Sequence, residues 1–268
     1  MQLLSFKSLW DMKTGTLEEN LEKIAEAGYG GVEFTLPPQD KHKQFRELLE
    51  RYNLAFIAQV VTRDDHISSF ESLARQAAEF NPVKIVSHSA KDSMSYEDQL
   101  RFFEKALAVE EDLAIPVAHE THRGRAMFTP WATSRLLHQF PELKITADFS
   151  HWCCVCESLL QDQADHMSIA LDRAIHIHGR VGYAEGPQVA DPRAPEYTRE
   201  VKAFVNWWME ICKRRAADGY AVMTFTPEFG PPGYMHTLPF TNQPVTNVWE
   251  VNKWMNQFFS ETYREVFE

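Results

Sequence analysis

Short apolar runs alternate with longer amphipathic runs along the whole chain. The apolar runs have four to eight residues and are rich in Val, Ile and Phe, which is typical of buried β-strands. In the longer runs an apolar residue recurs every three or four positions, as it does on one face of an α-helix. Strands are therefore predicted over residues 3–6, 31–34, 54–61, 83–88, 117–120, 144–148, 175–178 and 221–226.

The predicted helices carry sequence signals at several of their ends. Thr16-Leu-Glu-Glu19 has the spacing of a capping box, in which side chains satisfy the free backbone N–H groups at a helix start. Thr129-Pro130 combines a preferred N-cap residue with proline at the first helical position. Helices are predicted over residues 17–27, 45–52, 69–80, 96–113, 130–140, 157–174, 198–217 and 247–265. Eight strands that alternate with eight helices predict an α/β chain folded as a (β/α)8 TIM barrel.

An open, doubly wound sheet is the competing α/β fold. It normally carries a Gly-rich phosphate-binding turn after its first strand, and the sequence has neither a G-x-G-x-x-G motif nor a Walker A motif. The length of 268 residues also suits a barrel, because such barrels occupy about 250 residues around one core. The barrel is therefore the preferred fold, as a single domain over residues 1–268.

Composition excludes several classes of protein. The 27 Lys and Arg against 38 Asp and Glu give a net charge of −11, which opposes binding to the phosphates of nucleic acids. No apolar run approaches the roughly 20 residues needed to cross a bilayer. The first residues also lack the basic, apolar and small-residue order of a signal peptide. A cytoplasmic protein without a nucleic-acid or membrane partner is expected.

Candidate chemistry lies at the carboxyl ends of the last four predicted strands. Glu120, Asp148, His178 and Glu228 occupy these positions, where barrels hold their functional groups. Because neighbouring strands lie about 4.8 Å apart, the four side chains can converge. Three carboxylates together repel one another unless a cation compensates them, and this donor set suits one divalent ion such as Mg, Mn, Co or Zn. The alternative is four separate residues held by hydrogen bonds.

Other polar side chains are placed to contact a bound substrate. Histidines follow the predicted strands closely, and arginines can pair with a phosphate or carboxylate group. A long Pro-rich segment over residues 179–196 is typical of a lid or a binding loop. The candidate substrate contacts are His88, His122, Arg123, His151, Arg180, Gln188 and Arg193.

Several further residues have weaker claims. His176 shares the face of His178 and is interpreted as an interior histidine or as a partner that orients it. Lys7, Glu33 and Gln59, near the ends of earlier strands, are minor candidates for substrate hydroxyl contacts. Trp10 either stacks on a sugar or forms part of a wall.

With its Glu, Asp-x-x-His, His-x-His and Pro-Glu motifs on strands five to eight, the chain resembles the xylose isomerase-like TIM-barrel superfamily. Within it, the sequence is similar to the sugar-phosphate isomerase/epimerase group. The resemblance implies that Glu120, Asp148, His178 and Glu228 hold one divalent metal and that the two glutamates also act as acid and base. It implies that His151 is the substrate-binding histidine of Asp-x-x-His.

The resemblance leaves several substrates and reactions open. Either Arg180 or Arg193 takes the place of an epimerase arginine, but residues 122–125 and 179–193 depart from the epimerase pattern. The expected function is a metal-dependent isomerase or epimerase that acts on a small carbohydrate, or its phosphate, through an enediolate. The alternatives are a dehydratase of a polyol ketone, a phosphodiesterase similar to apurinic endonucleases, and a non-catalytic sugar-binding barrel. Assembly into a homo-oligomer also stays open.

Overall fold

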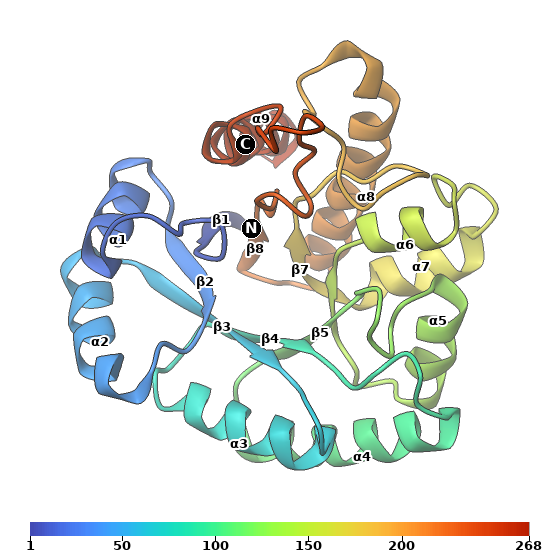
Figure 1. Cartoon of the computed structure of the whole chain (residues 1–268). Coiled ribbons are helices and arrows are strands. Elements are labelled where there is room, and N and C mark those ends of the chain that lie inside the picture. Colours follow the sequence, from blue (N-terminus) through green and yellow to red (C-terminus); the bar gives the residue numbers. More distant parts are fainter. Residues whose placement is uncertain (268) are drawn as a thin grey trace.

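The strands form one closed parallel barrel, as Figure 1 shows. The computed structural model describes residues 1–267. Each strand pairs with its successor, and β8 pairs with β1. The predicted (β/α)8 TIM barrel is thereby confirmed. The strands are β1 (Gln2–Ser8), β2 (Gly31–Thr35), β3 (Ala55–Val61), β4 (Lys84–His88), β5 (Val117–Glu120), β6 (Ile145–Ala147), β7 (Ala174–His178) and β8 (Val222–Thr226).

Helices surround the barrel and bury their apolar faces against it (Figure 1). The capping box of Thr16 and Glu19 is present, and Thr129 accepts a hydrogen bond from the N–H of Ala132 at the start of its helix. None of the helices described is long and apolar enough to cross a membrane. The helical segments are α1 (Leu17–Glu26), η1 (Gln39–Lys41), α2 (His42–Arg51), α3 (His66–Ala78), α4 (Tyr96–Leu113), α5 (Pro130–Gln139), α6 (Ser150–Val155), α7 (Ala164–Arg173), η2 (Pro195–Tyr197), α8 (Thr198–Ala217) and α9 (Val248–Phe267).

The helix predicted over residues 157–174 is wrong in its first half. The chain forms the short helix α6 directly after β6, and α7 begins only at Ala164. Glu157 and Leu160 have φ angles of 49° and 59°, in the left-handed region that interrupts a helix. Ser158 Oγ accepts a hydrogen bond from the N–H of Leu160, so a local turn competes with helix formation here.

The barrel interior contains a buried lysine. Lys84 Nζ donates to Ile175 O at 2.5 Å and to Thr224 Oγ1 at 2.8 Å. Burial lowers the pKa of Lys84 from its ordinary 10.5 to about 7, although Glu33 partly opposes this shift. The protonated lysine therefore destabilises the folded state relative to the unfolded chain, and this penalty is relieved as the pH rises from about 7 toward 10.5.

Comparison with Lys84→Met tests this pH dependence. Urea unfolding of both proteins between pH 7 and 10 should show the wild type gaining stability relative to the variant, by at most about 1.4 kcal/mol per pH unit. The sign follows because the unfolded chain binds the extra proton in this range. A stability difference independent of pH would contradict the lowered pKa.

Candidate metal centre

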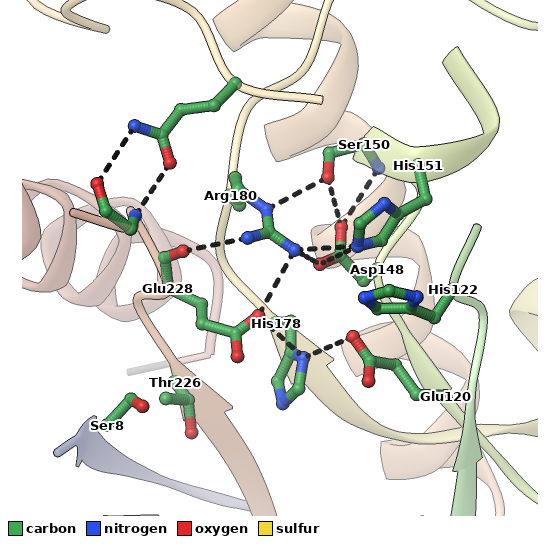
Figure 2. Close-up of polar contacts among 12 residues, drawn as sticks. Ser8, Glu120, His122, Asp148, Ser150, His151, His178, Arg180, Thr226 and Glu228 are labelled. Atoms are coloured by element: carbon green, nitrogen blue, oxygen red, sulfur yellow. Dashed lines mark hydrogen bonds and ion pairs between the residues drawn. The ribbon is translucent and has the colours of Figure 1, made fainter. Parts of the chain in front are cut away.

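The four candidate ligands converge at the mouth of the barrel (Figure 2). Glu120 and His178 end β5 and β7, Asp148 follows β6, and Glu228 lies two residues beyond β8. One ligand atom from each lies within 4.8 Å of those of the other three, and all four residues are buried. The structure therefore brings together the residues that the strand-end pattern selected.

His178 occupies the middle of this group. Its Nδ1 lies 3.3 Å from Glu120 Oε1 and 3.0 Å from Glu228 Oε2, whereas its Nε2 lies 2.8 Å from Glu33 Oε1. Burial disfavours the charged imidazole, but Glu228 and Glu33 outweigh that effect and hold the pKa of His178 well above its usual value. The ring thus directs Nδ1 toward Glu120 and Glu228 and Nε2 toward Glu33.

Arg180 supplies a second positive charge. Its guanidinium is buried, pairs with Asp148, and lies 3.4 Å from Glu228 Oε2. It also donates from Nε to Ser150 Oγ at 3.1 Å. Burial raises the pKa of Asp148 to about 6, although Arg180 opposes the rise. Figure 2 shows Arg180 between the two acids.

The donor set fits a divalent cation. Glu120 Oε2 and Glu228 Oε2 are buried, and neither accepts a hydrogen bond from the residues that the structure describes. His88 Nε2 lies 2.6 Å from Glu120 Oε2, within ion-pair range but without hydrogen-bond geometry. Carboxylate oxygens and one imidazole nitrogen are the ligands that Mg, Mn, Co and Zn ions take in such sites.

A cavity of about 80 Å³ is lined by two of the candidate ligands, Glu120 and Glu228. A larger hollow of about 410 Å³ lies beside β3 and α3, but none of the four candidate ligands lines it. The smaller cavity is therefore the candidate active site. Its lining residues are Trp10, Gln59, His88, Glu120, His122, Arg180, Glu228 and Tyr234.

Sequence similarity assigns the family. Residues 21–183, more than half of the chain, match the family described as Xylose isomerase-like TIM barrel. The chain belongs to this family. The resemblance inferred from the strand-end motifs is thereby confirmed.

Solved structures with a similar fold are distant in sequence. The probable 3-DHS dehydratase AsbF of Bacillus anthracis is 16% identical with a TM-score of 0.64, covering 97% of this chain and 99% of its own. A D-tagatose 3-epimerase-like protein is 17% identical with a TM-score of 0.63 and full coverage of both chains. A xylose isomerase-like TIM barrel protein from Mycobacterium smegmatis, in complex with magnesium, is 10% identical with a TM-score of 0.62 and 97% coverage of each. These similarities show the fold alone. No curated protein sequence matches the chain.

Most of the predicted substrate contacts lie at or beside the cavity of this xylose isomerase-like barrel. His88, His122 and Arg180 line it. His151 is buried, with its ring centroid 4.0 Å from that of His122 and its Nε2 2.9 Å from Arg180 Nη2. Arg123 lies further out, 5.4 Å from the ring of Tyr234.

Two predicted substrate contacts lie elsewhere. Gln188 is fully buried, accepts from Gly230 N at 2.7 Å and donates to Gly230 O at 3.4 Å. Arg193 pairs with Asp191 and donates to Thr246 Oγ1 at 2.9 Å. Neither side chain lines the cavity, so the structure gives no support to a substrate contact by Gln188 or Arg193.

Sequence reasoning missed Tyr234, which covers the cavity together with Trp10. The two rings meet edge to face, with centroids 5.3 Å apart, and Arg180 lies 4.6 Å from the centre of the Tyr234 ring. Tyr234 comes from the Pro-rich loop after β8. Its position six residues beyond Glu228, in a segment rich in Gly and Pro, was the available signal.

The backbone that carries Glu228 is fixed by side chains from other segments. Asn252 of α9 accepts from Phe229 N at 2.8 Å and donates to Phe229 O at 2.9 Å. Gln188 bonds both backbone groups of Gly230, and Arg180 Nη1 donates to Glu228 O at 3.4 Å. Three consecutive residues are thereby held, which limits the movement of the Glu228 side chain.

Asn252→Ala should lower the free energy of unfolding by about 2 kcal/mol, because two buried backbone groups of Phe229 lose their partner. Thermal or urea unfolding measures this loss. Asn256→Ala is the matched control on the same helix, since Asn256 Oδ1 has no hydrogen-bond partner among the described residues. Equal losses in both variants would contradict a specific role of Asn252.

Proposed function

We propose that this protein is a divalent-metal-dependent isomerase or epimerase that acts on a small carbohydrate or its phosphate. The observation that carries the proposal is the position of Glu120 and Glu228. Both line one cavity, both offer an oxygen without a hydrogen-bond donor, and both contact Nδ1 of His178. Two acids on one cavity suit the removal of a proton from a carbon and its return.

Glu120, Asp148, His178 and Glu228 are the proposed ligands. A divalent ion held there would polarise a substrate carbonyl and offset the negative charge that develops on its oxygen. One glutamate then accepts the proton from the adjacent carbon, and the other returns a proton to the resulting enediolate. Burial opposes ionisation of Glu120, but His88 and His122 hold its pKa well below the usual range, so this side chain is an ionised carboxylate, the form that a proton acceptor requires.

Neutral histidines frame the cavity. Burial lowers the pKa of His122 to about 4 and the pKa of His151 well below its ordinary value. His122 Nδ1 donates to the carbonyl of Arg123, which leaves Nε2 as an acceptor for a substrate hydroxyl. Neutral rings suit a polyhydroxy substrate because they form hydrogen bonds without adding charge.

Metal analysis followed by proton exchange in D₂O tests the proposal. The purified protein should contain one divalent ion per chain. With ketoses, hydroxyketoacids or cyclic polyol ketones as probes, it should introduce deuterium at the carbon next to the carbonyl. Chelation should stop the exchange, and addition of the ion should restore it.

The same experiment separates the competing reactions. Loss of a β-hydroxyl after exchange would indicate a dehydratase, which needs the same carbon-bound proton. Hydrolysis of a phosphodiester without exchange into any carbonyl compound would overturn the proposal. The net charge of −11 disfavours a nucleic-acid substrate.

A further inference from the structure

A continuous chain of hydrogen bonds runs through the barrel interior beneath the candidate metal centre. It begins at Lys84 of β4, whose Nζ donates to Thr224 Oγ1 of β8 at 2.8 Å. Thr224 Oγ1 lies 2.7 Å from His176 Nδ1 of β7. Since the oxygen of Thr224 already accepts from the lysine, its one proton is available for His176.

The donor at Lys84 therefore sets the direction of the following bonds. His176 Nδ1 accepts from Thr224, so His176 Nε2 carries the ring proton in the neutral form. That nitrogen lies 3.1 Å from Glu33 Oε2 of β2 and donates to it.

The Glu33 carboxylate lies within hydrogen-bond distance of four donors. His176 Nε2 and Thr226 Oγ1 bond its Oε2, the latter at 2.5 Å, while Gln59 Nε2 bonds its Oε1 at 3.1 Å. The fourth contact is His178 Nε2, 2.8 Å from Oε1. A carboxylate offers about four acceptor positions, so Glu33 is saturated and has none left for a cation. His178 must donate through Nε2.

We propose that Glu33 is a positioning residue for the metal centre. By accepting the Nε2 proton of His178, it fixes the ring with Nδ1 toward Glu120 and Glu228, which lie 3.3 and 3.0 Å away. Thr224 and His176 link Glu33 to Lys84 by hydrogen bonds. The inference rests on the proposed function, because it assigns His178 as a metal ligand through Nδ1.

Glu33→Gln tests this role against a matched control. The control is Glu110→Gln, because Glu110 Oε1 lies 2.8 Å from Nε2 of the buried His119, outside the candidate metal centre. Both variants should lose stability in thermal unfolding. Only Glu33→Gln should weaken binding of Mn²⁺ in calorimetric titration, by about 10- to 100-fold, because the amide can donate to His178 and favour the wrong tautomer. Unchanged Mn²⁺ affinity in Glu33→Gln would overturn the inference.

The wild-type protein gives a test that does not depend on folding of a variant. With Zn²⁺ as a diamagnetic probe, ¹⁵N NMR of the imidazole rings should show His178 protonated at Nε2 and coordinated through Nδ1. Coordination through Nε2 would overturn the inference while leaving the proposed metal centre intact. A wild-type protein that binds neither Mn²⁺ nor Zn²⁺ would overturn both.

Discussion

Glu228→Gln should lower deuterium exchange at the carbon next to the substrate carbonyl by about 10²- to 10⁴-fold, the usual contribution of a positioned acid or base. The amide keeps the size of the side chain but cannot accept the carbon-bound proton. The effect should be this large because Glu228 is held tightly. Arg180 bonds the backbone carbonyl of Glu228, and Asn252 and Gln188 bond the backbone of the next two residues, Phe229 and Gly230.

Both the metal content and the exchange rate of the variant must be measured, because Glu228 is also a proposed metal ligand. Glutamine retains one oxygen donor, and the variant should still bind a divalent ion at saturating concentration. Glu185→Gln is the control and should exchange at the wild-type rate, because Glu185 is an exposed residue of the loop after β7. If Glu228→Gln holds the ion and still exchanges normally, Glu228 is not the proton-transfer group.

The convergence of the four strand-end residues was predictable because it depends on local pattern and simple geometry. Alternation along each strand fixes which side chains face inward, and the order of strands around the barrel follows the order in the chain. Helices whose first and last residues carry capping signals were also predictable from the sequence. The observed α4 spans Tyr96–Leu113 as expected, with Ser95 capping its start and Ala114 in the left-handed region at its end.

The remaining features of the site depend on contacts between distant segments. Glu33 and His176 are 143 residues apart, and only the register of β2 against the rest of the barrel shows that their side chains meet. The sequence offered Glu33 as a substrate contact, whereas the structure surrounds it with donors from the barrel. Gln188 was likewise predicted to contact substrate, but its side chain bonds Gly230, which lies in another long loop.

Arg180→Met should lower the free energy of unfolding of the metal-free protein by about 3–5 kcal/mol, the usual cost of removing one partner from a buried ion pair. Asp148 and Glu228 would lose the guanidinium that contacts both, and the pKa of Asp148, which burial already raises to about 6, would rise further. Binding of Mn²⁺ should become stronger, on the order of tenfold, because a positive charge next to the proposed site is removed. The variant should therefore show a larger metal-induced rise in melting temperature than the wild type.

Arg215→Met separates this coupling from a general loss of stability. Arg215 is equally buried, but its closest acid is Asp218, 2.8 Å away on the outer layer of the barrel. Its removal should destabilise the protein and leave the metal-induced rise in melting temperature unchanged. If Arg180→Met behaves in the same way, Arg180 and the divalent ion do not compensate the same carboxylates. If the rise is larger only in Arg180→Met, the guanidinium and the ion share Asp148 and Glu228, and the charge balance of the centre depends on both.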